Sequence, residues 1–495
     1  MDLFGTAGIR GSAEARVTPE LALAVGRAVA TEVRAAGEEG KSAEVVVARD
    51  GRVTGPAIAA AMESGLASGG VQVLRAGQLP TPALAHASQG RYGVMLTASH
   101  NPPTDNGIKL FRDGSEFDRE AELGVEERVA GEEPPATWDE WTTAERVDTL
   151  GGYLDAVRAY AEGFGSDLDG LRIAVDCGNG MSAPATPTVL RELGARVVTL
   201  NGNVDGHFPG RGSKPTPETL RDLRAFIADA NEGVEHPGRA SATGAENADA
   251  NGFAFGIGHD GDSDRIVIVD ADGEVVHEDT VLALLAERYT RESDAGDPVV
   301  VTTPNASGRI DERVREAGGR VERVRLGALH EGIAAVRADA EAAASGNADA
   351  PGTRVVFAAE PWKHIHVAFG EWIDGVASAA VISRLVAETG LDALREPIAE
   401  RPYRKVSVDC PDDAKSGAMD RLATALPDAF PDATIDTDHG VRLEFPDASW
   451  TLVRPSGTEP YVRVYAESDD VDDLVADVEA VVADAVRAAI ADGGA

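Results

Sequence analysis

Three aspartates at alternate positions are the most distinctive chemical feature of the sequence. Asp260, Asp262 and Asp264 lie in the stretch GHDGDSDRIVIVD, where an apolar run follows them directly. Carboxylates at i, i+2 and i+4 on a loop can converge on one hard divalent cation, and a set without histidine or cysteine favours Mg²⁺ over zinc. A calcium-binding EF-hand loop is excluded, because its sixth position requires glycine and is Arg265, and its twelfth requires glutamate and is Ala271. A solvated acidic turn is the alternative.

In the stretch MLTASHNPPTDNGIKLF, an apolar run ends at a serine. Ser99 precedes His100, Asn101 and two prolines, which cannot continue a central strand. Taken alone, such a serine is more typical of an ordinary turn or a helix N-cap than of a catalytic site. Lys109 lies in the same stretch and is one of six lysines in the chain, but by itself it is equally typical of an edge strand.

A turn near the C-terminus combines the groups that hold a phosphate monoester. The stretch LVRPSGTEPYVRVY contains Arg454, Ser456, Gly457 and Thr458. A guanidinium group, two hydroxyls and exposed amides are the donors that phosphate requires. The alternative is a hairpin turn with an arginine that faces the solvent. Arg10, in the opening stretch LFGTAGIRGSA, lies between glycines and is by itself typical of a surface arginine.

Polar and aromatic residues crowd the end of another apolar run, in FAAEPWKHIHVAFGEWIDG. Glu360 can accept hydroxyl protons, and Trp362 offers a flat apolar face, so we interpret this segment as a sugar-binding edge. His364 and His366 form a His-x-His pair that could ligate a metal, but the segment offers neither a cysteine nor a third histidine. The sugar-binding interpretation is therefore favoured.

Three segments that could position these residues share one pattern, at 43–77, 171–200 and 297–327. Each has a β-branched run, a polar turn, an amphipathic helical stretch that ends in glycine and a second valine-rich run. Strand, helix and strand within about thirty residues predict a βαβ unit with parallel pairing. The repetition predicts three α/β domains of similar design. Chance similarity among α/β segments is the alternative.

The chain after residue 400 has a different pattern. A helical stretch, SGAMDRLATALPD, precedes three strand-like runs, GVRLEF, SWTLVRPS and YVRVYAE, and a long alanine-, valine- and aspartate-rich helix follows them. This order predicts an α+β domain with antiparallel hairpins. Residues 232–252 and 338–352 carry no periodicity, and we predict solvated loops there.

The composition limits the classes of partner. A formal net charge of −38 excludes duplex nucleic acid and anionic membranes as natural partners. Forty arginines against six lysines on an acidic chain indicate a halophilic source, although an acidic protein from a GC-rich genome is the alternative. Cys177 and Cys410 lack metal-ligand spacing and argue against zinc or a disulfide framework. Without a leader or a membrane-length apolar run, we expect a cytoplasmic protein.

As a set, FGTAGIRG, TASHNPPTDNGIKL, DGDSDR and RPSGTEPYVRV resemble the α-D-phosphohexomutase family of phosphoglucomutases and phosphomannomutases, in the family's order. DGHFPGRGSKPTPETL is similar to a segment of the family's second domain. The resemblance implies three similar α/β domains with mixed sheets and a smaller α+β domain around a central cleft. We place them at 1–150, which carries the phosphoserine loop, 151–280 with the metal loop, 281–397 with the sugar loop and 398–495 with the phosphate clamp.

The resemblance also implies roles for single residues. Ser99 would be the phosphoserine, and a phosphate oxygen on it would share Mg²⁺ with the aspartates Asp260, Asp262 and Asp264. Arg10 and Arg265 would steady the transferring group, and Lys109 or His100 would handle the proton of the sugar hydroxyl. The phosphate that is not transferred would be held by Arg454, Ser456, Gly457 and Thr458.

The family's sugar-recognition loop reads Glu-x-Ser-Gly-His, and here Glu360 and His364 match while Trp362 and Lys363 replace the two small residues. Ala7 is a smaller departure, since many members carry aspartate there. Because Lys363 would repel an ammonium group, we predict a preference for glucose or mannose phosphates over glucosamine phosphate. Phosphoglucosamine mutase and a catalytically silent sugar-phosphate binder are the alternatives. The expected partners are small hexose phosphates, and the expected state is a monomer or homodimer.

Overall fold

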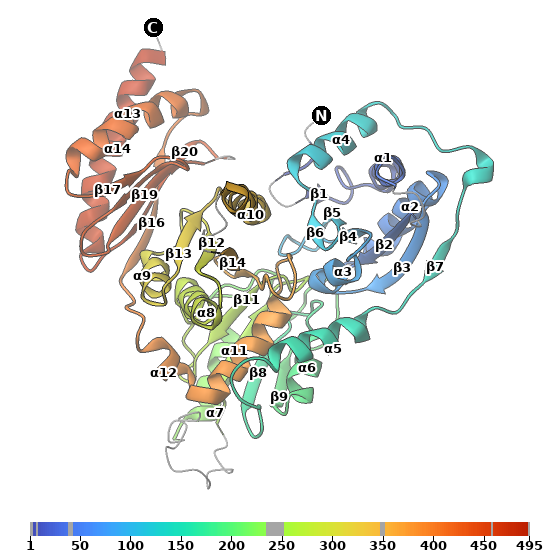
Figure 1. Ribbon diagram of the computed structural model, residues 1–495, viewed down its shortest axis with the longest axis horizontal. Coiled ribbons are helices and arrows are strands. Elements are labelled where there is room, and N and C mark those ends of the chain that lie inside the picture. The colour runs from blue at the N-terminus through green and yellow to red at the C-terminus, as the bar shows by residue number, and fades with distance from the viewer. Residues whose placement is uncertain are drawn as a thin grey trace. The chain divides into compact units, whose positions relative to one another are not determined.

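The computed structural model describes residues 3–5, 8–37, 43–233, 252–346, 352–456 and 459–493. The chain divides into two compact units, Met1–Val281 with Phe357–Arg395 and Leu282–Val356 with Glu396–Ala495. Figure 1 labels the elements of both. Within the described ranges, no helix combines the length and the apolar character that a membrane crossing requires.

The first sheet has the strand order β1-β5-β4-β2-β3-β7, with β6 paired to β5. Its strands are β1 (Ile9–Ser12), β2 (Glu44–Arg49), β3 (Gln72–Gln78), β4 (Tyr92–Leu96), β5 (Asp105–Arg112), β6 (Ser115–Glu116) and β7 (Ala144–Arg146). Strand β2 pairs in parallel with both β3 and β4, whereas β5 runs antiparallel to β1 and β4. The accompanying helices are α1 (Pro19–Ala35), α2 (Gly55–Ser68), α3 (Thr81–Ala87), α4 (Arg119–Ala130) and the short η1 (Trp138–Glu140).

The predicted βαβ unit at 43–77 is present as β2, α2 and β3. The β-branched run Val45–Val47 is buried in the sheet. Helix α2 begins with a proline in its first turn, where the missing N–H costs nothing, and stops at Gly69 and Gly70. It packs against α1, and the close approach depends on Gly26 and Gly65, where a Cβ atom would lie 2.6 and 2.3 Å from backbone oxygens.

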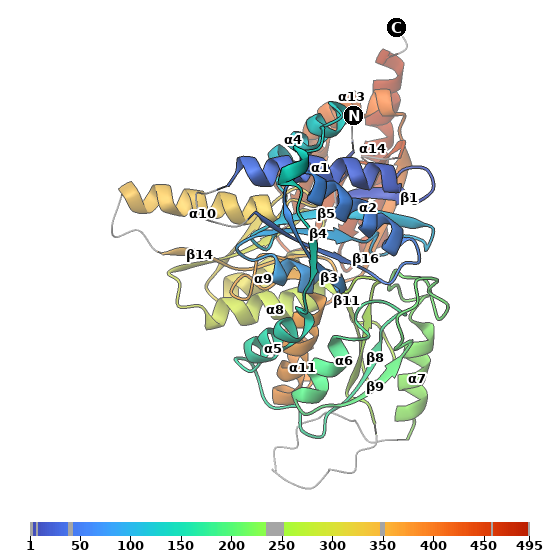
Figure 2. The same ribbon diagram turned by 90° about the vertical axis from the view of Figure 1, so that its right-hand side faces the viewer.

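The second sheet has the order β11-β10-β8-β9 and contains the second predicted βαβ unit. Its strands are β8 (Arg172–Asp176), β9 (Arg196–Leu200), β10 (Phe255–His259) and β11 (Ile266–Val269), and its helices are α5 (Leu150–Ala161), α6 (Thr186–Glu192) and α7 (Arg221–Asn231). Figure 2 shows α6 and α7 on opposite sides of β8 and β9. Strands β10 and β11 form an antiparallel hairpin whose turn is the aspartate segment. Of the predicted loop at 232–252, residues 234–251 lie outside the described residues.

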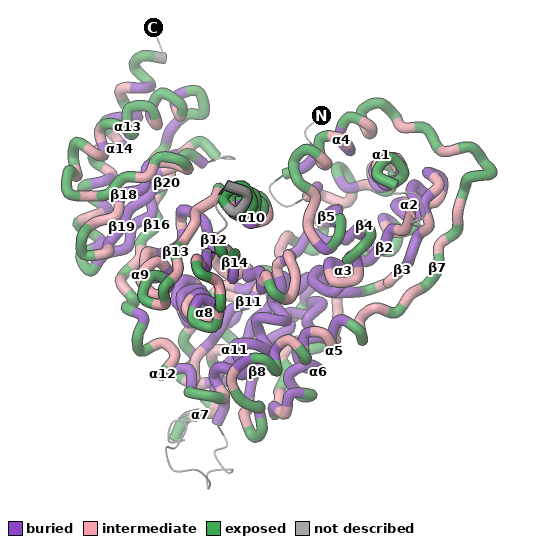
Figure 3. Tube along the Cα trace, viewed as in Figure 1, coloured by how far each residue is buried: buried purple, intermediate pink, exposed green. Residues whose placement is uncertain are grey.

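The third sheet has the order β13-β12-β14-β15, and the third βαβ prediction is confirmed by the parallel pairing of β12 with β13. The elements are β12 (Asp297–Thr302), β13 (Arg320–Arg323), β14 (Thr353–Glu360), β15 (Lys363–Ile365), α8 (Glu278–Glu292), α9 (Gly308–Glu316), α10 (Leu329–Gly346), α11 (Gly375–Thr389) and α12 (Leu391–Arg395). Figure 3 shows α11 as buried along most of its length, like strand β8.

The predicted loop at 338–352 is wrong over its first part, because α10 continues to Gly346. Five alanines between residues 338 and 344 have the highest helix propensity of any residue and sustain the helix without an apolar stripe. Residues 347–351 lie outside the described part of the chain.

The C-terminal sheet is antiparallel throughout, in the order β16-β20-β19-β18-β17, as the α+β pattern predicted. The elements are β16 (Tyr403–Asp409), β17 (Thr434–Asp436), β18 (Val441–Glu444), β19 (Trp450–Pro455), β20 (Tyr461–Glu467), α13 (Lys415–Ala429), α14 (Val471–Gly493) and the short η2 (Asp412–Ala414). The sequence did not predict β16 or β17. Both are edge strands with few buried residues, so they carry only a weak apolar signal.

A buried ion pair joins α9 to the C-terminal sheet. Arg309 Nη2 lies 2.7 Å from Glu467 Oε1, and each side chain is 1% exposed. Trp450 Nε1 donates to the second oxygen of Glu467 at 2.9 Å, and Arg442 donates to the Pro304 carbonyl at 2.6 Å. The segment after residue 396 is therefore fastened to α9 and its neighbouring loop by fully desolvated polar contacts.

Candidate active site

The structure brings Ser99 and the aspartate turn together. Ser99 follows strand β4, the aspartates connect β10 to β11, and Ser99 Oγ donates a 2.7 Å hydrogen bond to Asp260 Oδ2 across 161 residues of sequence. Both side chains are buried. The two loops approach closely because Gly261 has no side chain: a Cβ atom there would lie 2.6 Å from the Ser99 carbonyl oxygen. A serine hydroxyl is thus presented to a carboxylate cluster.

Ser99 itself has an unusual backbone conformation. Its φ is +52°, in the left-handed region that residues other than glycine rarely adopt. Its backbone N–H donates to Thr97 Oγ1 at 2.9 Å, and its carbonyl accepts from Arg52 at 2.8 Å. Such strain persists where the surroundings over-determine the conformation, and it is often found at functional sites.

The aspartates fit a divalent cation. One carboxylate oxygen from each of Asp260, Asp262 and Asp264 lies within 4.8 Å of the other two, and all three residues are buried. The Oδ1 atoms of Asp262 and Asp264 have no hydrogen-bond partner among the described residues. Buried carboxylate oxygens without a donor are costly unless a cation satisfies them. An all-oxygen donor set suits Mg²⁺.

Two threonines hold the middle aspartate. Thr81 Oγ1 donates to Asp262 Oδ2 at 2.6 Å, and the Thr81 N–H donates to the Asp262 carbonyl at 3.0 Å. Thr97 Oγ1 lies 3.2 Å from the same carboxylate oxygen. One oxygen of Asp262 is therefore oriented by Thr81 and Thr97, while the other has no hydrogen-bond partner among the described residues.

The charges around the cluster differ from one aspartate to the next. Burial raises the pKa of Asp260 well above its usual range, and the Asp264 and Asp262 carboxylates raise it further. Burial opposes the charge of Asp264 too, but the cations of Lys109 and Arg265 outweigh it and lower the pKa of Asp264. Nearby cations therefore compensate the charge of Asp264 more fully than that of Asp260.

Lys109 contacts the aspartate cluster, and His100 contacts the Ser99 hydroxyl. Lys109 Nζ lies 3.1 Å from Asp264 Oδ2 and 3.5 Å from Glu116 Oε1; burial alone would lower its pKa, yet these carboxylates raise it. His100 Nδ1 lies 3.3 Å from Ser99 Oγ. Burial, together with the charges of Arg265 and Arg10, lowers the pKa of His100 to about 3.

Two arginines near the cluster have N–H donors without a hydrogen-bond partner among the described residues. Arg265 Nε lies 3.8 Å from carboxylate oxygens of both Asp260 and Asp264, too far for a hydrogen bond. Arg10 lies on β1, where it pairs with Gly107 of β5. The Nε atoms of Arg10 and Arg265 are buried and have no hydrogen-bond partner within the described ranges. Both guanidinium groups can therefore serve an anion.

The predicted phosphate clamp belongs to the other compact unit. Arg454 lies at the end of β19 and donates to the Tyr465 hydroxyl at 2.9 Å. Ser456 is buried, and its Oγ accepts from the Glu459 N–H at 3.2 Å. Gly457 and Thr458 lie outside the described residues. Clamping of phosphate by this turn stays a prediction.

The predicted sugar loop has both partly exposed and buried residues. Glu360 and Lys363 are partly exposed and form an ion pair at 3.2 Å. Trp362 has a φ of +68° and packs against the core of the second sheet. His364 is 1% exposed and lies 3.0 Å from Ser378 Oγ, and burial lowers its pKa to about 3. His366 shares the same serine at 2.8 Å.

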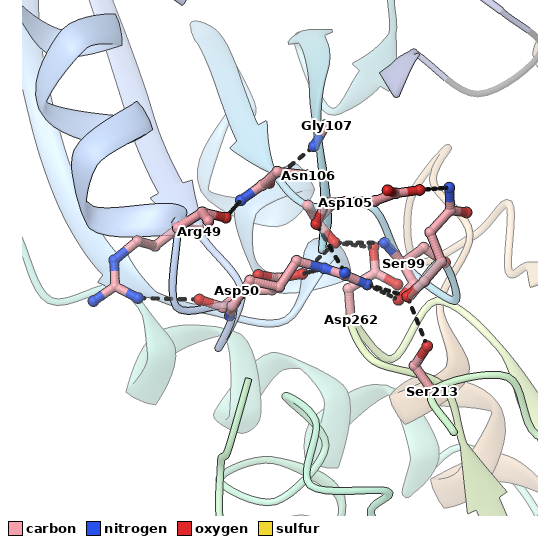
Figure 4. Close-up of polar contacts among 12 residues, drawn as sticks. Arg49, Asp50, Ser99, Asp105, Asn106, Gly107, Ser213 and Asp262 are labelled. Atoms are coloured by element: carbon pink, nitrogen blue, oxygen red, sulfur yellow. Dashed lines mark hydrogen bonds and ion pairs between the residues drawn. The ribbon is translucent and has the colours of Figure 1, made fainter. Parts of the chain in front are cut away.

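Several residues of the site were missed by sequence reasoning, and they form its supporting layer: Asp50, Arg52, Thr81, Thr97 and Arg211. Figure 4 shows part of this network around Ser99. Arg211 donates to Asp176 Oδ2 at 2.8 Å and to the carbonyl of His259, just before the aspartates. A usable signal was present for Asp50 and Arg52, because they follow β2, and the carboxyl ends of the parallel strands β2 and β4 meet at one sheet edge.

Known proteins share this architecture. Residues 1–136 match the α/β/α domain I of phosphoglucomutase/phosphomannomutase, residues 152–273 match domain II, and residues 406–485 match the C-terminal domain. The fold and the site together define an intramolecular phosphotransferase. The chain belongs to the α-D-phosphohexomutase family, as its motifs predicted.

Individual relatives cover almost the whole chain. A phosphopentomutase of Thermococcus kodakarensis is 39% identical over 475 residues, and a probable phosphoglucosamine mutase of Methanopyrus kandleri is 40% identical over 475 residues; each alignment covers 94% of both chains. A crystal structure of a phosphoglucomutase/phosphomannomutase family protein from Burkholderia thailandensis superposes with a TM-score of 0.78 at 26% identity, covering 98% of this chain and 97% of that one.

Proposed function

We propose that this protein moves a phosphoryl group between two hydroxyls of one sugar by way of a phosphoserine at Ser99. The observation that carries the proposal is the 2.7 Å contact between Ser99 Oγ and Asp260, inside a buried cluster of three carboxylates. A catalytically silent binding protein would have no need of a strained serine aimed at such a cluster.

In the proposed reaction, a phosphoryl group on Ser99 is transferred to the free hydroxyl of a sugar monophosphate. The phosphorus–oxygen bond to Ser99 Oγ breaks as the bond to the sugar oxygen forms, and the hydroxyl proton passes to the neutral imidazole of His100, because Lys109 is already protonated beside Asp264 and Glu116. The resulting sugar bisphosphate returns its other phosphoryl group to Ser99, recovers a proton and leaves as the isomeric monophosphate. Arg10 and Arg265 would neutralise the transferring group, because such transition states are stabilised mainly by charge and alignment.

Mg²⁺ held by Asp260, Asp262 and Asp264 would neutralise charge on the transferring phosphoryl group. Asp262→Asn should therefore weaken Mg²⁺ binding and reduce the rate by orders of magnitude. Isothermal titration with Mg²⁺ measures the binding separately from activity. Full activity of this variant in EDTA would make the aspartate segment a structural turn.

Glucosamine phosphate is the proposed substrate, in place of the glucose or mannose phosphate that the sequence predicted. That prediction depended on repulsion by Lys363, but its charge is compensated by Glu360 at 3.2 Å and gives no reason to exclude an ammonium group. The similarity to the Methanopyrus protein, a probable phosphoglucosamine mutase, supports the amino sugar as substrate. A pentose phosphate is the second candidate, because the Thermococcus phosphopentomutase is similar over the same length.

The decisive experiment compares kcat/KM for glucosamine 1-phosphate, ribose 1-phosphate, glucose 1-phosphate and mannose 1-phosphate, at low and at molar KCl. Intact-mass analysis should show one phosphoryl group on the active protein, and Ser99→Ala should lack both that group and the activity. Ser68→Ala is the control, since Ser68 is also buried but donates within helix α2. Wild-type turnover by Ser99→Ala would refute the phosphoserine, and a best substrate other than glucosamine phosphate would refute the assigned sugar.

A further inference from the structure

Arg52 is bound entirely to the turn that carries Ser99. Its Nε donates to Asp50 Oδ2 at 2.9 Å. Its four remaining N–H groups are matched by four backbone carbonyls of the 99–105 turn, those of Ser99 (2.8 Å), Asn101 (2.9 Å), Pro102 (2.5 Å) and Asp105 (2.9 Å). Guanidinium has five N–H donors in a fixed planar fork, and here each has its own acceptor. Figure 4 shows polar contacts around Asp50, Ser99 and Asp105.

The turn needs such a fastening because of the conformation of Ser99. The residue adopts a φ of +52°, which an L-amino acid abandons unless its neighbours hold it there. Thr97 Oγ1 holds the N–H of Ser99, and Arg52 holds its carbonyl. With both flanking peptides fixed, the direction of the Ser99 side chain toward Asp260 is fixed as well.

Arg52 is also connected to the rest of the site. It is fully buried, as is Asp50, and its guanidinium lies over the ring of Phe208, 5.2 Å from the ring centroid. Thr97 Oγ1 lies 2.8 Å from Asp50 Oδ2 and 3.2 Å from Asp262 Oδ2. One chain of contacts therefore leads from Arg52 to the cation-binding cluster.

We propose that Arg52 is a positioning residue for phosphoryl transfer, which keeps the hydroxyl of Ser99 at the aspartate cluster without touching the reacting atoms. The proposal depends on the proposed function in one respect, because it assigns Ser99 as the group to be held. Lysine cannot replace Arg52, because an ammonium group has three donors at one point and cannot reach four carbonyls and a carboxylate.

The test compares Arg52→Lys with a matched control, Arg384→Lys. Arg384 is also buried, and it also donates to backbone carbonyls, at 2.6 Å to Phe164 and 3.5 Å to Glu162, but it lies on α11 away from the serine turn. A misplacement of about 1 Å at a reacting group costs about 100-fold in rate. We expect Arg52→Lys to lose about 100-fold in kcat with KM little changed. Arg384→Lys should keep the wild-type kcat, even if its melting temperature falls as much as that of Arg52→Lys.

Hydrogen exchange of the amides of residues 98–107 gives a readout that needs no activity. Exchange should quicken in Arg52→Lys and stay unchanged in Arg384→Lys. Unchanged exchange in Arg52→Lys would overturn the proposal, and so would an unchanged kcat or an equal loss of kcat in the control. If the wild type turned over none of the four sugar phosphates, the proposed function would fail, while exchange would still decide whether Arg52 holds the turn.

Discussion

Thr81 Oγ1 and Asp262 Oδ2 lie 2.6 Å apart, so the first turn of a helix in one domain orients a carboxylate that belongs to the next. The contact fixes one oxygen of Asp262 and leaves the other without a donor among the residues described. Groups that orient metal ligands typically contribute 10- to 100-fold to metal affinity. This geometry predicts that cation binding by the aspartates depends on Thr81, which is not itself among the proposed ligands.

We expect Thr81→Ala to weaken Mg²⁺ binding by about 10-fold or more, because the Asp262 carboxylate loses its fixed orientation. Thr81→Ser keeps the hydroxyl and should bind as the wild type does. Calorimetric titration with Mg²⁺ measures both variants. Equal affinities for alanine and serine would show that the hydrogen bond has no part in the site.

Lys109→Met should make the fold more dependent on Mg²⁺. The substitution leaves Asp264 without its buried cation at 3.1 Å, and a buried charge that loses its partner costs about 3–5 kcal/mol. A divalent cation replaces the missing charge, so Mg²⁺ should raise the melting temperature of the variant more than that of the wild type. Melting curves in EDTA and in Mg²⁺ test this, and a smaller Mg²⁺ shift in the variant would contradict it.

The ion pair between Glu360 and Lys363 should tune sugar selectivity. Lys363→Met exposes the Glu360 carboxylate, which should favour the ammonium group of glucosamine phosphate over glucose phosphate by a few-fold. Glu360→Gln leaves the lysine uncompensated and should shift selectivity in the opposite direction. The ratio of kcat/KM for the two sugars measures both effects. Shifts in the same direction would mean that the loop does not sense charge.

Asp374 should make stability depend on pH. Burial raises its pKa to about 6, even though Ala377 N–H, Trp372 Nε1 and the Tyr153 hydroxyl donate to it. The folded state therefore holds a proton that the unfolded state releases near pH 4. The free energy of unfolding should fall as pH rises from about 4 to about 6, by roughly 3 kcal/mol, and this contribution should stay constant above that window.

Comparison with Asp374→Asn isolates this group, because asparagine does not titrate. The variant should be less stable overall, since its amide nitrogen cannot accept from a donor, but its melting temperature should fall less steeply between pH 4 and pH 6. Identical slopes for the two proteins would assign the pH dependence to other groups.

The net charge of −38 should make the fold depend on salt. The screening length is about 10 Å at 0.1 M and about 3 Å at 1 M, so repulsion among the uncompensated carboxylates grows as salt is removed. The melting temperature should rise between 0.1 and 3 M KCl by an amount larger than in a chain of near-zero charge. A melting temperature indifferent to KCl would argue against halophilic adaptation.

The parts of the fold that could be predicted are those with a local signal. The run at Val45, the proline at Pro56 and the glycines after Ser68 predict β2, α2 and β3 without any knowledge of their partners. The C-terminal part of helix α10 was predicted to be a loop, because alanine favours a helix without producing an apolar periodicity in the sequence. Edge strands such as β16 were missed because all of their positions are exposed or only partly buried, so their sequences carry a weak apolar signal.

Residue type and spacing single out the candidate residues of the site, but for the supporting layer the sequence offers only the position of Asp50 and Arg52 after β2. The spacing of Ser99 and the aspartates in the sequence indicates a functional site. The role of Arg52 becomes visible only in the fold, where its N–H groups donate to backbone carbonyls of a turn about fifty residues away. The charge of Lys363 was misjudged for a related reason. Its partner, Glu360, lies three residues away, and the pairing depends on the hairpin between β14 and β15.

The buried pair of Arg309 and Glu467 has a consequence for anyone who wishes to shorten the protein. A truncation after residue 397 would remove Glu467 and leave the Arg309 guanidinium without its counter-charge. The excised C-terminal piece would carry the opposite defect, with an orphaned carboxylate beside Trp450. Each fragment would also expose to water a surface that the intact chain buries, which lowers its stability. The C-terminal segment is therefore not a detachable module, and the clamp it carries is best studied in the intact chain.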